Sequence, residues 1–253
     1  MKTVSILTDL LERTIHIEGK IDRMERTLQS ADKKREYLKS YSQYGEDIVI
    51  YRLFEQLHIE KPSYIDIGAH HPYYISNTAL LYETGSRGIN IEANPILFRA
   101  FEKERRQDVN ICCGVGKEVG NMPFYMIDEY SGRNTFIKEL AEKFVQSNPD
   151  FCIQKVMQVE VQTLDQIVRK YVRGGVFPDY LSIDIEGLEY DVLCSYNLKE
   201  NGPKILTLEI MHNHLSVKPD LEKVLKHAEY FLYLKTGSNY TWVKNQYKKS
   251  ILE

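Results

Sequence analysis

The stretch Ser63–Pro72 constrains the fold of this chain more than any other. Tyr64–Ile67 is apolar at three of four positions, which is typical of a short buried strand, and Gly68 permits a sharp turn after it. Apolar spacing from Ile75 to Tyr82 predicts a helix, and Gly88–Glu92 predicts a second strand. A strand, a glycine turn, a helix and another strand together predict a doubly wound α/β sheet whose turn contacts a ligand.

The acid at the end of the second strand indicates a nucleoside cofactor. Glu92 follows Asp66 by 26 residues, and doubly wound folds place a ribose-binding carboxylate about 20 residues beyond the glycine turn. Dinucleotide folds bring a helix against the pyrophosphate with three glycines, but only Gly68 is present here. S-adenosylmethionine fits a single glycine better, because its methionine end carries an ammonium and no phosphate. A β–α unit without any ligand explains a lone glycine turn about equally well.

The residues that follow resemble a known family. Ile75–Glu83 leads through Arg87 and Gly88 to Ile91–Pro95, with a Ser-Asn-Thr helix start, a glycine-led strand and an acidic tip. This pattern resembles the FkbM family of S-adenosylmethionine-dependent methyltransferases over about residues 42–234. The resemblance implies a Rossmann-like, seven-stranded sheet of the class I methyltransferase type. Further matching elements are Ser42–Asp47, Thr163–Asp165 and Asp184–Gly187.

Two regions are expected along the chain, an N-terminal helix in residues 1–40 and a methyltransferase domain in residues 41–253. With 253 residues and 43% hydrophobic content, the chain can bury one substantial α/β core. A set of residues recurs at alternating steps of three and four, which is the a/d spacing of three heptads. This spacing predicts a coiled-coil helix that joins copies of the chain through residues 3–30. A single amphipathic helix lying on its own domain stays open. The repeat comprises Leu7, Leu10, Thr14, Ile17, Ile21, Met24 and Leu28.

Composition disfavours several classes of function. The net charge is −3, from 33 basic and 36 acidic residues, so no broad basic field favours a nucleic-acid substrate. The sequence contains no run of about 18 apolar residues, so no membrane span is predicted. The first residues lack the charged and then apolar pattern of a secretory signal. We therefore expect a cytoplasmic protein without a membrane span. The four cysteines have no spacing typical of a zinc site or a disulfide framework.

Four acids are expected at the carboxyl ends of strands, where open parallel sheets bind ligands. Unpaired in one cleft, Asp66, Glu92, Asp184 and Glu209 would repel one another, so cationic partners are expected. We assign Asp66 to the cofactor ammonium or a nearby water, and Glu92 to the ribose diol. Asp184, Glu209 and His212 then form an oxygen and nitrogen set suited to Mg²⁺ or Mn²⁺. Alternatively, the acids pair with arginines and His212 lines a polar pocket.

Further site residues follow from the resemblance and from acid–base chemistry. The turn at Gln43 either lies over the pocket, as the resemblance implies, or only begins a helix. Methyl transfer needs a base for the departing proton, and His71, Glu186 and His212 are the main candidates, beside His70 and His214. His70 and His71 depart from the family pattern, so a structural His-Pro turn stays open. The expected cofactor-binding residues are Gln43, Asp66, Gly68, Ala69, Asn77, Glu92, Asn94, Gly114, Val115 and Asp184.

The resemblance implies a methyltransferase that modifies a hydroxyl of a sugar, a sugar-nucleotide or a related polar molecule in polysaccharide or natural-product biosynthesis. Metal assistance is part of this hypothesis. The polar segment Tyr130–Asn134 is expected at the mouth of the site as a substrate lid. Two alternatives remain: a nicotinamide-dependent reductase, which the missing glycines disfavour, and a non-catalytic coiled-coil binding protein.

Overall fold

The computed structural model describes residues 38–210 and 221–252. The predicted oligomerisation helix in residues 3–30, together with His212 and His214, lies outside the described residues. The chain divides into two compact units, Met1–Lys39 and Ser40–Glu253, and the fold described below is that of the second. Within the described residues, no helix has the length and apolar character that a bilayer crossing requires.

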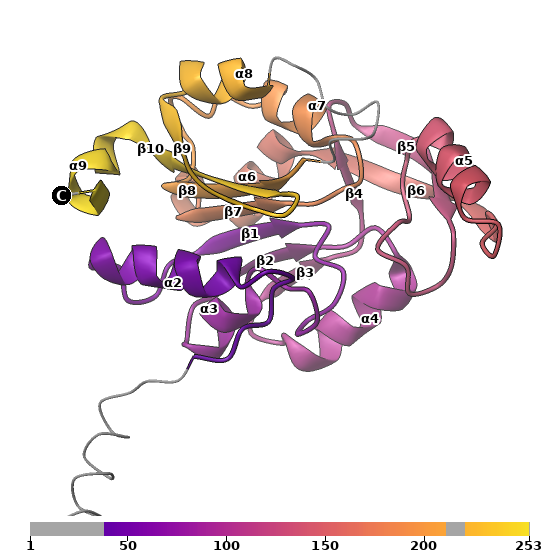
Figure 1. Ribbon diagram of the computed structural model, residues 1–253, viewed down its shortest axis with the longest axis horizontal. Helices are drawn as coiled ribbons and strands as arrows, with labels where there is room; N and C mark the ends of the chain where they lie inside the picture. Colours follow the sequence, from indigo (N-terminus) through magenta and orange to yellow (C-terminus); the bar gives the residue numbers. More distant parts are fainter. Residues whose placement is uncertain (1–37, 211–220, 253) are drawn as a thin grey trace, which may run out of the picture. The chain divides into compact units, whose positions relative to one another are not determined.

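The larger sheet has seven strands in the order β3-β2-β1-β7-β8-β10-β9 (Figure 1). The first five are parallel, and β10 runs antiparallel to both β8 and β9. This confirms the predicted doubly wound, seven-stranded α/β fold. The strands are β1 (Tyr64–Ile67), β2 (Gly88–Ile91), β3 (Val109–Ile111), β7 (Tyr180–Ile183), β8 (Ile205–Glu209), β9 (Tyr230–Thr236) and β10 (Asn239–Lys244).

Helices cover both faces of this sheet, because alternate residues of each buried strand point to opposite sides. Ile65 and Ile67 pack in a cluster with residues of α6, α7 and α8, whereas Tyr64 packs with residues of α2, α3 and α9. Figure 1 shows α7 and α8 above the strands and α2 and α3 below them. The helices are α2 (Glu46–Gln56), α3 (Ala79–Glu83), α4 (Pro95–Glu104), α6 (Leu164–Tyr171), α7 (Glu189–Cys194), α8 (Leu221–His227) and α9 (Lys248–Leu252).

A second sheet of three strands, in the order β4-β6-β5, lies beside α5 (Lys138–Ser147). Its strands are β4 (Gly114–Gly116), β5 (Gly120–Met126) and β6 (Lys155–Thr163). β3 and β4 belong to different sheets, because the chain changes sheets at Cys112–Cys113. β6 is the central strand of the smaller sheet. Its alternating pattern reflects one exposed face rather than an edge position.

A row of buried polar residues crosses the main sheet on the Tyr64 face. Within it Thr78 Oγ1 donates to Asp66 Oδ2 at 2.7 Å, and Asn77 Nδ2 donates to Ser182 Oγ at 3.2 Å. Asp66 is only 4% exposed. Because side chains alternate between the two faces along β1, that of Asp66 lies on the face that packs against α3. The strand-end position expected for Asp66 is thus corrected: it lies inside β1. In register order the row comprises Asn110, Asn90, Asp66, Ser182, Thr207 and Thr241.

The helix predicted from Ile75 begins only at Ala79. Ile75 has a φ of +52°, a left-handed conformation that is a marked outlier for a β-branched residue and costs about 1–3 kcal/mol. The loop holds this conformation from both sides: the Tyr74 N–H donates to His71 Nδ1 at 3.1 Å and the Ser76 N–H to the Tyr41 carbonyl at 2.9 Å. Apolar spacing alone could not reveal this left-handed residue.

Candidate active site

A pocket of about 310 Å³ is lined by residues at the carboxyl ends of β1, β2, β7 and β8. Three of the expected cofactor residues are not part of its lining: Asp66, Asn77 and Ala69. Asp66 belongs to the polar row behind the pocket, Asn77 donates a hydrogen bond to Ser182 of that row, and Ala69 is buried. The expected cofactor residues that do line the pocket are Gln43, Gly68, Glu92, Asn94, Gly114, Val115 and Asp184.

The glycine turn after β1 packs directly on the neighbouring strands. Gly68 has a φ of +76°, and a Cβ there would lie 1.7 Å from the Asp184 carbonyl oxygen. The N–H groups of Gly68 and Ala69 both donate to the Ile91 carbonyl, at 2.9 and 3.1 Å. Glycine is therefore required here by contact between the ends of β1 and β7, whether or not a ligand approaches.

Glu92 holds the two loops at the tip of β2 together. Its Oε2 accepts the His70 N–H at 2.8 Å, and its Oε1 accepts the Asn94 N–H at 2.7 Å. Burial raises the pKa of this carboxyl group, and the two N–H donors oppose that rise. Each oxygen retains further acceptor capacity, so the carboxylate can accept hydrogen bonds from two neighbouring hydroxyls.

The end of the pocket beyond Glu92 is apolar. Phe124 and Phe136 line it with ring centroids 4.7 Å apart, and Leu97 adds an aliphatic wall. Gly114 is the close neighbour here, because a Cβ on it would lie 2.5 Å from Phe136 Cζ. Such an apolar wall suits one face of a flat heteroaromatic ring. The sequence did not indicate the two phenylalanines, because buried aromatic residues are typical of a hydrophobic core.

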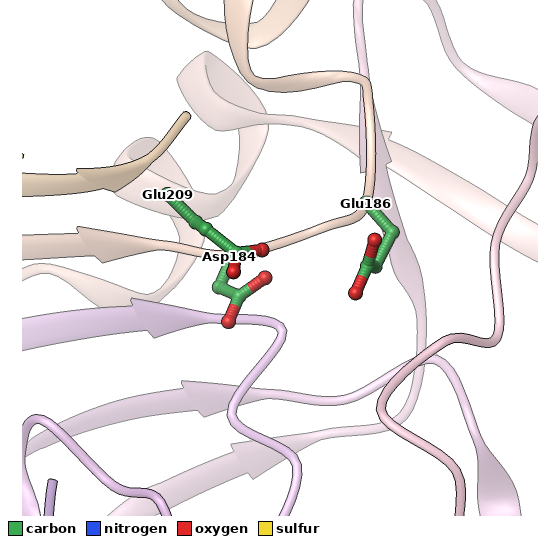
Figure 2. Close-up of side chains that lie close together, drawn as sticks. All are labelled: Asp184, Glu186 and Glu209. Carbon is green, nitrogen blue, oxygen red and sulfur yellow. The ribbon is translucent and has the colours of Figure 1, made fainter. Parts of the chain in front are cut away.

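Three acids gather at the other end of the pocket (Figure 2). Asp184, Glu186 and Glu209 each offer a carboxylate oxygen, and these atoms lie within 4.8 Å of one another. Asp184 follows β7 and Glu209 ends β8, as expected from the strand order. Glu186 was expected as a base, and the structure places it in the same cluster. We call these three residues the acid triad.

The electrostatics of the acid triad favour protonation or a cation. Burial, and then the charges of Glu209 and Glu186, raise the pKa of Asp184 well above its usual range. Burial and Glu209 also raise the pKa of Glu186 to about 8, although the guanidinium of Arg133 opposes this. Arg133 Nη1 lies 3.3 Å from Glu186 Oε1, and Ser238 Oγ donates to Glu209 Oε1 at 2.9 Å. A bound divalent cation would offset the remaining repulsion.

The turn after β7 holds Glu186 in a strained conformation. Glu186 has a φ of +52°, and Gly187 follows with a φ of +119°. The carboxylate of Glu189 accepts the N–H groups of Ile185 and Gly187 at 3.1 Å, and Thr135 Oγ1 donates to the Glu186 carbonyl at 2.9 Å. These bonds fix the direction of the Glu186 side chain, which the sequence pattern could not indicate.

The histidines of the first loop are placed differently from each other. His71 is not part of the pocket lining; its Nδ1 accepts the N–H groups of Tyr73 and Tyr74 at 3.1 Å. Burial and then His70 lower the pKa of His71, so the neutral ring has a structural task in this turn. His70 does line the pocket, and its Nε2 lies 3.1 Å from the Tyr130 carbonyl. His212 remains a prediction.

The segment before α2 reaches the pocket through Gln43. Asp47 is buried and accepts hydrogen bonds from Ser40, Ser42 and the Tyr41 N–H. Glu46 is also buried and accepts Asn239 Nδ2 at 2.6 Å. The two acids therefore hold the segment in place and Gln43 extends over the pocket. The segment Tyr130–Asn134 also lines the pocket, as expected.

With a chelator present, the protein is expected to lose stability between about pH 4.5 and pH 8. The folded-state pKa of Glu186 is raised to about 8 from its ordinary 4.5, so the folded protein retains a proton that the unfolded chain releases. Stability then falls by at most about 1.4 kcal/mol per pH unit for this one group. Urea denaturation across this range checks it, and Glu186→Gln should flatten the slope. Equal slopes in both proteins would contradict the pKa.

A comparison with models of known protein families identifies one family. The model of a family described as "Methyltransferase FkbM domain" matches residues 66–234. No relative was found among the curated protein sequences.

Three solved structures are distantly similar. A proposed methylase from Haemophilus influenzae has 8% identity and a TM-score of 0.38, with 78% of this chain and 85% of that chain covered. The second structure is a 1,6-didemethyltoxoflavin-N1-methyltransferase from Burkholderia thailandensis with bound 1,6-didemethyltoxoflavin and S-adenosylhomocysteine. It has 12% identity and a TM-score of 0.39, with 90% of this chain and 89% of that chain covered. A proposed RNA methyltransferase from Pyrococcus horikoshii has 10% identity and a TM-score of 0.35, with 87% of this chain and 98% of that chain covered. Similarities this low transfer no residue role.

Proposed function

Because the chain belongs to the FkbM methyltransferase family, we propose that it transfers the methyl group of S-adenosylmethionine to a hydroxyl of a sugar, a sugar-nucleotide or a related polar small molecule. The observation that carries the proposal is one pocket with Glu92 toward one end and the acid triad at the other. The family match leaves no need for the reductase or the non-catalytic binding protein considered above.

The cofactor is proposed to lie along the strand ends, with its sulfonium supplying the methyl group. Glu92 would accept the two ribose hydroxyls, because each of its oxygens keeps acceptor capacity beside the bonds to His70 and Asn94. The adenine would lie against the apolar wall that Leu97 and the packed pair Phe124 and Phe136 form. Gly68 leaves the loop after β1 close to the methionine portion.

A divalent cation is proposed at the acid triad. The fit rests on the cluster of carboxylate oxygens within 4.8 Å of one another and on the raised pKa values of Asp184 and Glu186. An all-oxygen set suits Mg²⁺ or Mn²⁺, which can lower the pKa of a hydroxyl in contact with it. Asp184 and Glu209 would hold the ion. Glu186 would take the hydroxyl proton, because its carboxylate lies in the same cluster as the two residues that would hold the ion.

Calorimetric titration with S-adenosylhomocysteine, with NAD in parallel, tests the cofactor. We expect micromolar binding of S-adenosylhomocysteine alone, since the pocket lacks the three-glycine turn that binds a pyrophosphate. No binding in buffer that contains Mn²⁺ would overturn the proposal. Screening sugar-nucleotide acceptors with and without Mn²⁺ then tests the metal, which would be abandoned if activity survived exhaustive chelation.

A further inference from the structure

Three large side chains line the pocket and yet expose much of their surface. Tyr74 is 63% exposed, Ile75 39% and Tyr130 69%. Large apolar and aromatic surface left open at a pocket is typical of a ligand contact, whereas a scattered exposed side chain elsewhere needs no explanation. None of these residues is used by the cofactor or by the cation as proposed above.

Backbone strain is concentrated around the same pocket. Among the described residues, five other than glycine have a positive φ, and His70, Ile75 and Glu186 of these line the pocket. A β-branched residue such as Ile75 adopts this conformation only where its surroundings impose it. The bonds from the N–H groups of Tyr74 and Ser76 impose it here. In this conformation Ile75 and Tyr74 line the pocket and keep much of their surface exposed.

The two tyrosines come from different segments that are joined at the pocket. Tyr74 lies in the loop after β1, and Tyr130 lies in the segment between β5 and α5. His70 links the segments, because its Nε2 lies 3.1 Å from the Tyr130 carbonyl and its ring centroid is 6.5 Å from that of Tyr74. Arg133, from the same segment as Tyr130, reaches the acid triad through Glu186. Aromatic surface and polar groups therefore flank one opening.

We propose that Tyr74, Ile75 and Tyr130 form the platform that binds the acceptor, and that the platform takes the carbon-bearing face of a sugar ring. This inference rests on the proposed function. A pyranose has an apolar C–H face and a rim of hydroxyls, and the electron-rich face of a tyrosine ring attracts such C–H groups. With that face on the platform, the hydroxyl rim is free to meet the acid triad.

Saturation-transfer NMR tests the platform directly. The probes are methyl α-glucoside, methyl α-mannoside, UDP-glucose, GDP-mannose and catechol, each with S-adenosylhomocysteine and the diamagnetic ion Mg²⁺ present. We expect saturation of ring C–H protons in at least one sugar probe. Tyr74→Ala and Tyr130→Ala should each lower the affinity for that sugar about tenfold. Phe151→Ala, which removes an exposed aromatic side chain outside the pocket, should leave the affinity unchanged.

Ile75→Gly separates binding from folding. Glycine adopts a φ of +52° without strain, so the variant should keep its thermal stability and still bind the sugar about tenfold more weakly. A clear loss of stability with unchanged sugar affinity would make the role of Ile75 merely structural and would overturn its place in the platform.

Titration of S-adenosylhomocysteine into the same samples distinguishes the two levels of the proposal. If the wild-type protein fails to bind it, the proposed function fails. If binding is normal but no sugar probe is saturated, or only catechol is, the sugar platform is overturned. The same holds if sugar affinity is equal in the wild-type protein and both tyrosine variants.

Discussion

Replacing Asp184 by asparagine is expected to weaken Mn²⁺ binding by about a hundredfold or more and to stabilise the metal-free protein. The carboxylate is partly buried beside Glu209 and Glu186, and both neighbours raise its pKa. Asparagine removes a ligand oxygen and also the cost of holding this carboxyl group, protonated or charged, beside two other acids, which we expect to add about 1 kcal/mol to the free energy of unfolding near neutral pH.

Two measurements check the Asp184 prediction together. Calorimetry gives the Mn²⁺ affinity, and urea denaturation with a chelator gives the free energy of unfolding. Asp165→Asn is the matched control, because Asp165 is a surface acid paired with Arg169 at 2.9 Å and is not part of the pocket lining. It should change the free energy of unfolding by less than about 0.5 kcal/mol. Unchanged Mn²⁺ affinity in Asp184→Asn would remove Asp184 from the cation site.

Replacing Glu92 by glutamine is expected to lower affinity for S-adenosylhomocysteine by about a hundredfold. Hydrogen bonds to a charged group contribute about 1.5–3 kcal/mol each, and the amide retains only one acceptor oxygen. Its NH₂ group would also face the N–H of either His70 or Asn94. Stability should therefore fall by about 1–3 kcal/mol.

The control for Glu92 is the same substitution on an exposed strand position. Glu160 lies on β6, is exposed and is not part of the pocket lining, so Glu160→Gln should leave both cofactor affinity and stability unchanged. Calorimetry on the folded fraction of each variant makes the comparison. Wild-type affinity in Glu92→Gln would refute the ribose contact, whatever the stability shows.

Much of the fold could be predicted because its strands are short apolar runs bounded by turns. The strand at Tyr64–Ile67 has the predicted bounds, and the strand predicted over Gly88–Glu92 ends one residue earlier, at Ile91. Features that depend on contacts distant in sequence could not be predicted. The helix after β1 begins late because Tyr41 and His71 hold the residues around Ile75 from outside that helix, and local periodicity carries no trace of either contact.

The candidate site was predicted in part for a related reason. Parallel strands bring their carboxyl ends together, so Asp184 and Glu209 could be expected to meet from strand order alone. Asp66 was misplaced because a shift of one residue along a strand moves a side chain to the opposite face of the sheet. Its register partners are the polar residues Asn90 and Ser182. Glu186 and the segment that contains Tyr130 were expected near the site, whereas Tyr74 was not. The strained turn that places Glu186 and the loop that places Tyr74 depend on contacts that the sequence pattern does not specify.

The hydrogen bond from Asn239 to Glu46 joins residues 193 positions apart, and this separation affects the order of events during synthesis. A nascent chain that has left the ribosome only as far as β8 already contains every acid of the pocket. It still lacks the hairpin β9–β10, which holds Glu46 in place and orients Glu209 through Ser238. The enzyme is therefore expected to become active only when its last strands emerge, and a protease cut within that hairpin should silence it while leaving the pocket residues untouched.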